Sequence, residues 1–203
     1  MVVNIVYCIR INAGEAIHLK SMARVLVLAV ITTLFTCFTP CNAANNSSSI
    51  SPSERETLSS LDAKGIRIKW KSYTVEFAYW GPVHFVTGID TRNRHELCIY
   101  LTDTHDKVLY TFPLAEEIRW RTCDEVRAVA FTDVDKDGLA DVIVIGIYNT
   151  GVNITKNRFN AATVYFQKGK DFISDSDLDK QINSAHKNQT IDMVLEFLEG
   201  RFQ

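Results

Sequence analysis

The apolar positions of the chain fall into short runs that alternate with polar residues or are rich in aromatic and β-branched side chains. The runs are residues 66–70, 73–80, 96–102, 107–112, 126–131, 142–147 and 162–167. Such runs are typical of β-strands with one or both faces buried. The Gly-Pro pair at 81–82 is expected to end the second strand. The turn at residues 103–106 predicts a hairpin that places Ile99 and Leu101 near residues 108–110.

Two helices are predicted near the C-terminus. Ser176, followed three residues later by Asp179, resembles a capping box at the start of the first helix. The second is expected over residues 190–200, where Thr190 can cap the start and Gly200 suits the exit. Its apolar residues are spaced at i, i+3, i+4 and i+7: Ile191, Val194, Leu195 and Leu198. This stripe is expected to pack against the core.

Together these elements predict an α+β fold that is mostly antiparallel β with a C-terminal helix. Residues 54–203 are expected to form a single β-rich domain, with a short helix near its start. The aromatic-rich stretch from Trp70 to Phe85 is expected to lie in the sheet core, although a sugar-binding platform uses the same residue types. Residues 44–53 (ANNSSSISPS) are polar and of low complexity, and a flexible linker is expected there.

The N-terminus has the features of a secretory signal peptide. Residues 25–38 (VLVLAVITTLFTCF) are almost all apolar, Arg24 precedes them, and small residues follow. This arrangement predicts a signal peptide over residues 1–43, with Met22 as the true start. The apolar run is shorter than the roughly 20 residues of a membrane span, so no transmembrane segment is expected after cleavage. The protein is therefore expected to be periplasmic or secreted; an N-terminal anchor, a buried helix and a lipidated cysteine are the alternatives.

Charge and cysteine usage narrow the possible functions. Removal of residues 1–43 takes away three basic residues and one acidic residue and leaves a net charge of −4 without a basic stripe, so no nucleic-acid binding is expected. Two cysteines, Cys98 and Cys123, remain. In an oxidising compartment this pair predicts a disulfide, which would add roughly 3 kcal/mol of stability. Two independent buried thiols are the alternative.

The most informative segment is Asp133–Asp141 (DVDKDGLAD), which has the pattern D-x-D-x-D-G-x-x-D. Carboxylates at positions 1, 3 and 5 converge when the backbone coils around a centre, and a glycine at position 6 permits the sharp turn. Four carboxylates within nine residues repel one another unless a cation neutralises them. Calcium takes about six to eight oxygen ligands. The loop therefore predicts a calcium site whose ligands are Asp133, Asp135, Asp137, the Leu139 carbonyl and Asp141.

The residues after the loop exclude an EF-hand. An EF-hand has a glutamate at position 12 and a following helix, whereas position 12 here is Val144, within the β-branched run 142–145. A buried strand is expected instead. The order of strand, acidic loop, strand and Gly146, followed by a further strand and a glycine turn before Phe172, resembles the FG-GAP repeat of integrin α-subunit propellers and of bacterial secreted proteins. The resemblance covers residues 126–172.

A complete propeller is not expected, because a propeller needs about four or more blades and the chain has one such loop. The resemblance implies either a lone repeat within a compact α+β domain, which we favour, or degenerate blades upstream of it. It also implies that calcium has a structural role and ties the loop shut. The leading hypothesis is an exported calcium-binding protein with a structural or interaction role and an unknown protein or glycan partner.

Two other functions are open. An exported hydrolase with a structural calcium would draw its catalytic residues from His84, His95 or Glu96. A small periplasmic inhibitor or immunity-type protein is the other. The sequence has no zinc motif, nucleophile elbow, P-loop or dinucleotide fingerprint, and we therefore favour the non-enzymatic role.

Overall fold

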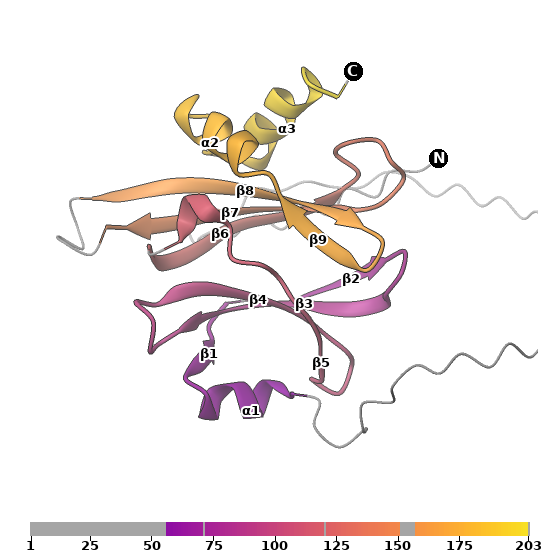
Figure 1. Ribbon diagram of the computed structural model, residues 1–203, viewed down its shortest axis with the longest axis vertical. Helices are drawn as coiled ribbons and strands as arrows, with labels where there is room; N and C mark the ends of the chain where they lie inside the picture. Colours follow the sequence, from indigo (N-terminus) through magenta and orange to yellow (C-terminus); the bar gives the residue numbers. More distant parts are fainter. Residues whose placement is uncertain (1–55, 71, 120, 151–156, 203) are drawn as a thin grey trace, which may run out of the picture. The chain divides into compact units, whose positions relative to one another are not determined.

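The computed structural model describes residues 56–70, 72–119, 121–150 and 157–202. They form two antiparallel β-sheets that pack face to face, with helices against the outer face of each sheet (Figure 1). The predicted α+β fold, mostly antiparallel with a helical C-terminus, is confirmed. The predicted signal peptide and linker lie outside the described residues.

The first sheet is a meander with one additional strand. Its strands are β1 (Ile66–Ile68), β2 (Tyr73–Phe77), β3 (Gly81–Asp90), β4 (Glu96–Thr102) and β5 (Val108–Thr111). Strands β2 to β5 pair in sequence order, and β1 pairs with β3 beyond the end of β2. In the predicted β4–β5 hairpin, Leu101 lies opposite Tyr110. Helix α1 (Leu58–Ala63) covers the outer face, where its Leu61 is buried.

The Gly-Pro pair was expected to end a strand, but in the structure it begins β3. A ten-residue strand begins at Gly81 itself. The positive φ of Gly81, 69°, allows the tight connection from β2. Pro82 lies opposite Glu76 of β2, whereas pairing with β4 begins only at His84. Pro82 is therefore placed where only one side of the strand has a partner, which is where a residue without an N–H is tolerated.

The second sheet is also a four-stranded meander. It consists of β6 (Thr122–Thr132), β7 (Asp141–Asn149), β8 (Arg158–Lys168) and β9 (Asp171–Ser174), and a 3₁₀ turn, η2 (Glu116–Ile118), precedes it. Along β8, Ala161 and Tyr165 face the first sheet, whereas Val164 faces the helices. In β7, a Cβ at Gly146 would lie 2.6 Å from atoms of the buried Tyr148 ring, so this close packing requires glycine.

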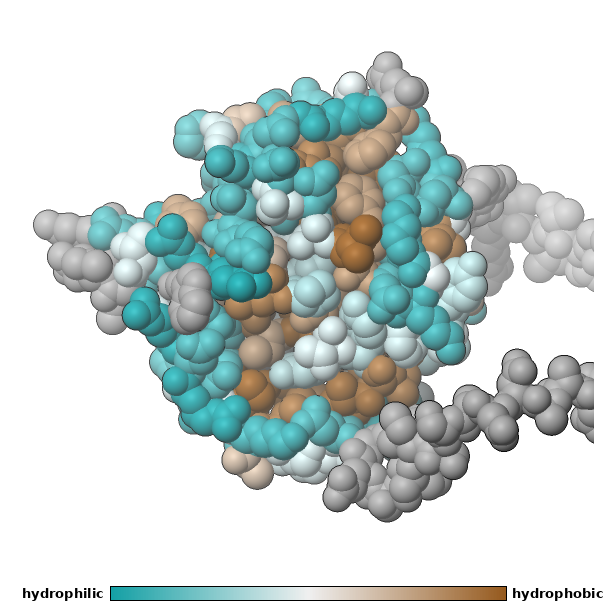
Figure 2. All heavy atoms as spheres, in the orientation of Figure 1, coloured by the Kyte–Doolittle hydropathy of each residue, from teal (hydrophilic) through white to brown (hydrophobic). Residues whose placement is uncertain are grey.

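The core between the sheets is rich in aromatic side chains. Its largest side chains are Phe77, Phe85, Phe112, Phe131, Tyr148, Tyr165 and Phe172. Phe85 of β3 and Phe131 of β6 meet edge to face across the two sheets, with ring centroids 5.3 Å apart. The predicted core position of the aromatic-rich stretch holds for Phe77 and Phe85, whereas Trp70, Tyr73 and Trp80 are partly buried against the core and Tyr79 is 54% exposed. Figure 2 shows hydrophobic residues near the middle of one face of the molecule, with hydrophilic residues around them.

Helices α2 (Ser176–Ser184) and α3 (Ile191–Glu199) pack on the outer face of the second sheet. Thr190 caps α3 as predicted, since its side chain accepts a hydrogen bond from the Met193 N–H. The predicted capping box at Ser176 is wrong by one residue, because Asp175 is the N-cap and accepts from the backbone N–H groups of the first turn. No helix within the described segments is long and apolar enough to cross a membrane.

Asp179 does not cap α2. Its carboxylate instead forms a hydrogen bond with the edge of β8. Strand β9 covers β8 only from Tyr165 onward. Before that point the Asp179 carboxylate accepts a hydrogen bond from the Val164 N–H at 2.9 Å. One turn further along the helix, the Asn183 amide both accepts from the N–H of Ala162 and donates to its carbonyl. Helix side chains thus occupy the edge that a fifth strand would otherwise cover.

The predicted disulfide is wrong, because Cys98 and Cys123 are both free. Cys98 lies on β4 and packs on the outer face of the first sheet, under α1. Cys123 lies on β6 and is buried in the core between the sheets. A β-sheet therefore separates the two side chains, and the alternative of two independent thiols holds.

Candidate metal centre

The acidic loop is the connection between β6 and β7. The last pair of the two strands is Thr132 with Asp141, and residues 133–140 form the loop beyond it. An antiparallel ladder of nine residue pairs thus fixes both ends of the loop. This ladder places the first and the last aspartate of the motif next to each other, as two strand ends in register require.

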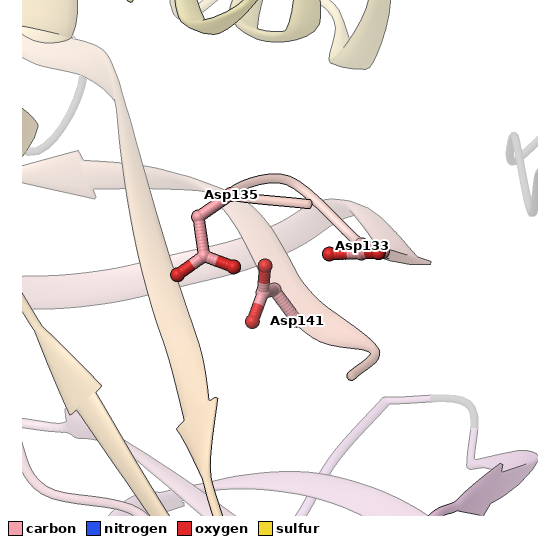
Figure 3. Close-up of side chains that lie close together, drawn as sticks. All are labelled: Asp133, Asp135 and Asp141. Carbon is pink, nitrogen blue, oxygen red and sulfur yellow. The ribbon is translucent and has the colours of Figure 1, made fainter. Parts of the chain in front are cut away.

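Three of the four aspartates converge. Asp133, Asp135 and Asp141 each offer a carboxylate oxygen, and these oxygens all lie within 4.8 Å of one another. Figure 3 shows the three side chains drawn toward a common centre from different parts of the loop. Asp141 is fully buried, and the other two are partly buried. Carboxylate oxygens held this close together repel one another strongly unless a cation lies between them.

Backbone hydrogen bonds fix the shape of the loop. The Gly138 N–H donates to Asp133 Oδ2 at 3.0 Å, and the Val134 N–H donates to Asp141 Oδ2 at 2.8 Å. Gly138 has a φ of 87°, a left-handed conformation that supports the prediction of a glycine turn at position 6. Lys136 also has a positive φ, 62°, and so the loop contains two left-handed residues.

Asp141 connects the loop to the neighbouring strand. Its Oδ1 accepts a hydrogen bond at 2.8 Å from the backbone N–H of Gln167, at the end of β8. Burial raises the pKa of the Asp141 carboxyl to about 6, although the two backbone N–H groups favour the ionised form. The Asp141 carboxylate is therefore buried away from solvent, and a bound cation would offset the unfavourable desolvation of its charged form.

One oxygen of the cluster lacks a partner. Asp133 Oδ1 is buried and accepts no hydrogen bond from any described residue. Unpaired buried polar atoms are rare in folded proteins and need an explanation. A metal ion coordinated by this oxygen would supply the missing partner, so the donor set fits a hard cation.

Asp137 is not among the three clustered aspartates. Asp137 forms an ion pair with Lys168 of β8, whose Nζ lies 2.7 Å from Asp137 Oδ2, and this hydrogen bond lowers the pKa of the Asp137 carboxyl. The Leu139 N–H donates to Asp137 Oδ1 at 2.9 Å. Both residues stay predicted ligands. The sequence did not indicate a role for Lys168, which belongs to the glycine turn predicted before Phe172.

The candidate catalytic residues of the hydrolase hypothesis do not form one site. His84 lies opposite Thr102, whereas Glu96 is at the other end of β4. Six residues of extended strand separate these positions, which corresponds to about 20 Å. His95 lies in the β3–β4 connection, and the Glu96 carboxylate accepts a hydrogen bond from Asn93. The structure therefore does not bring His84 together with the other two.

An open cleft of about 500 Å³ lies between β8 and the α2–α3 connection. Its amide side chains bond one another and the strand: Asn188 donates to the Asn160 carbonyl at 2.7 Å and to Asn183 Oδ1 at 3.0 Å, and Asn160 donates to Gln189 at 2.7 Å. These bonds hold the α2–α3 connection against β8. The amides of the cleft thus have a structural role, and none of the three hydrolase candidates lines it.

Family models, curated proteins and solved structures were compared with the chain, and none matches it. The chemistry of the acidic loop therefore carries the functional argument.

Proposed function

We propose that the protein is an exported calcium-binding protein in which the ion has a structural role. The observation that carries this proposal is the convergence of three aspartates, one of which has a buried oxygen that accepts no hydrogen bond from the described parts of the chain. Such a site offers only oxygen ligands, which favours calcium, magnesium or manganese over zinc or copper. Magnesium retains several waters and requires a strict octahedron, whereas calcium accepts an irregular protein cage.

The position of Asp141 supports a structural role for the ion. This carboxylate accepts hydrogen bonds from Val134 in the loop and from Gln167 in β8. An ion held by Asp133, Asp135 and Asp141 would therefore be linked to the loop, to β7 and to β8. Calcium would therefore hold the β6–β7 loop against β8.

The organisation of the two sheets supports an FG-GAP-like relationship. Each sheet contains a four-stranded antiparallel meander, which is the arrangement of a propeller blade. We propose that the second meander is the repeat with the calcium loop and that the first is a degenerate repeat, which replaces the lone repeat favoured from the sequence. In the first meander, only residues 78–80 connect β2 to β3, where the second has the acidic loop.

Thermal unfolding tests the structural role of the ion. A dissociation constant of about 0.1 mM, as in extracellular calcium modules, would add roughly 1.4 kcal/mol of stability at about 1 mM calcium. The midpoint of unfolding is expected to rise by about 3–5 °C relative to protein in a calcium chelator. Magnesium at the same concentration is the control and is expected to have a smaller effect. Superimposable curves in calcium and chelator would contradict a structural calcium site.

Export is tested by the N-terminus of the mature protein. We expect bacterial expression of the full chain with a C-terminal tag to yield exported protein that begins at Ala44 or Asn45, after cleavage at the predicted site. N-terminal sequencing or intact mass measures this directly. A chain recovered from the cytoplasm with residues 22–43 still attached would contradict export.

A further inference from the structure

Lys168 contacts the candidate metal centre from outside the loop. Its Nζ lies 2.7 Å from Asp135 Oδ2 and 2.7 Å from Asp137 Oδ2. Asp135 belongs to the three clustered carboxylates, and Asp137 is the predicted ligand that is not among them. One ammonium group therefore holds a member of the cluster and also the fourth aspartate of the motif.

The backbone beneath Lys168 is well anchored. Lys168 is the last residue of β8 and pairs with Asp171 of β9. The residue before it, Gln167, is fully buried and donates its N–H to Asp141 Oδ1 at 2.8 Å. Two consecutive residues of β8 thus contact the loop, one through the backbone and the other through the side chain. Strand β8 therefore positions the Lys168 ammonium beside the two carboxylates.

A divalent cation held by the predicted ligands and Lys168 would bind the same two carboxylates, those of Asp135 and Asp137. A calcium ion coordinated by Asp135 and Asp137 takes electron density from both groups, and it also repels the ammonium that contacts them. We propose that Lys168 is an intramolecular competitor for the cation and sets the calcium affinity of the loop. This inference rests on the proposed function, because it concerns the same site.

If Lys168 competes with the cation, removal of its charge has different effects from those expected if it only supports the loop. Without an ion, Lys168 offsets the repulsion between aspartates and stabilises the closed loop. With an ion, the same lysine opposes binding. Removal of its charge is therefore expected to destabilise the ion-free protein and to tighten calcium binding. A residue that only holds the loop in shape would instead weaken calcium binding when it is removed.

Solvent exposure limits the size of the effect. The Lys168 side chain is 44% exposed, and those of Asp135 and Asp137 are 16% and 30% exposed. Ion pairs in such partly solvated positions are modest, and water and salt screen them. We therefore expect Lys168→Met to lower the calcium dissociation constant by about threefold to tenfold at fixed ionic strength.

Calcium titration by calorimetry on protein expressed from the full chain tests this inference. The matched control is Lys170→Met, which removes the same charge from the same turn. Lys170 lies 5.8 Å from the Trp80 ring centroid, and its ammonium has no ion pair to the loop aspartates. We expect Lys170→Met to bind calcium within about twofold of wild type, because a distant exposed charge is screened. Lys168→Arg, which keeps the charge, is expected to stay closer to wild type than Lys168→Met.

The outcomes separate this inference from the proposed function. Tighter binding by Lys168→Met, with Lys170→Met unchanged, supports the competitor. Equal or weaker binding by Lys168→Met, with normal uptake by wild type, would overturn the competitor and leave the calcium site standing. An equal gain in both variants would assign the effect to net charge and overturn the contact mechanism. A wild-type protein without calcium uptake would overturn the proposed function and this inference with it.

Discussion

Asp141→Ala is expected to lower the free energy of unfolding by about 3–5 kcal/mol, even in a calcium chelator. The carboxylate is fully buried and accepts the N–H groups of Val134 and Gln167, each at 2.8 Å. Alanine leaves both donors without an acceptor, and an unsatisfied buried donor costs about 1–3 kcal/mol. The loop then loses its attachment to β8, and the response to calcium is expected to disappear.

Urea unfolding measures this effect, and two variants control it. Asp62→Ala replaces an exposed aspartate on α1 and is expected to change stability by less than about 0.5 kcal/mol. Asp141→Asn keeps one carbonyl oxygen for one of the two donors, so its loss of stability is expected to fall between the other two variants. An Asp141→Ala protein as stable as Asp62→Ala would show that this carboxylate does not hold the loop to β8.

Stability is expected to fall as pH rises from about 4 to about 8, because of the buried Asp179. Burial raises the pKa of this carboxyl from 3.8 to about 8, although the hydrogen bond from the Val164 N–H favours the ionised form. The nearby carboxylates of Asp175 and Glu117 raise this pKa further. The folded protein holds the proton more tightly than the unfolded chain, so the free energy of unfolding decreases by at most about 1.4 kcal/mol per pH unit in this range.

Asp179→Asn isolates the contribution of Asp179. The amide keeps an oxygen that can accept from the Val164 N–H but does not titrate. We expect a flatter stability profile between about pH 4 and 8 and a more stable protein at pH 8. Asp177→Asn, an exposed change on the same helix, is expected to keep the wild-type slope. The unfolding of the wild type and of both variants is measured in a calcium chelator, because the pKa of Asp141, a predicted calcium ligand, is also raised. Parallel profiles for wild type and Asp179→Asn would contradict this assignment.

Local pattern was sufficient to predict the strands that have long apolar or alternating runs. Residues 96–102 were expected as a strand, and β4 spans Glu96–Thr102. The run 142–147 predicted the central part of β7, which extends from Asp141 to Asn149 because both of its neighbours pair along that length. In these segments the apolar pattern and the tertiary pairing favour the same structure.

The sequence did not reveal elements whose formation depends on partners. Strand β3 begins with Gly81–Pro82, a pair that usually ends a strand, and it forms because β2 and β4 pair with different parts of it. Strand β9 has only four residues, too few for a recognisable alternation. Asp179 was expected to complete a capping box with Ser176, whereas in the fold it is buried against the edge of β8.

The candidate site was predicted only in part for the same reason. Spacing along the chain identified Asp133, Asp135 and Asp141, because their convergence follows from the shape of a single loop. Lys168 lies more than thirty positions from Asp135 in the sequence and reaches it through strand pairing. The two cysteines are the converse case, since an even pair favours a disulfide and yet a sheet lies between them.

Calorimetric titration of the protein with calcium shows whether the carboxylates of the β6–β7 loop hold a divalent ion. We expect saturable uptake of one ion per chain, with a dissociation constant on the order of 0.1 mM, that is lost in a variant carrying Asp133→Ala and Asp135→Ala. Absence of uptake by the wild-type protein at millimolar calcium, or undiminished uptake by the double variant, would contradict this expectation.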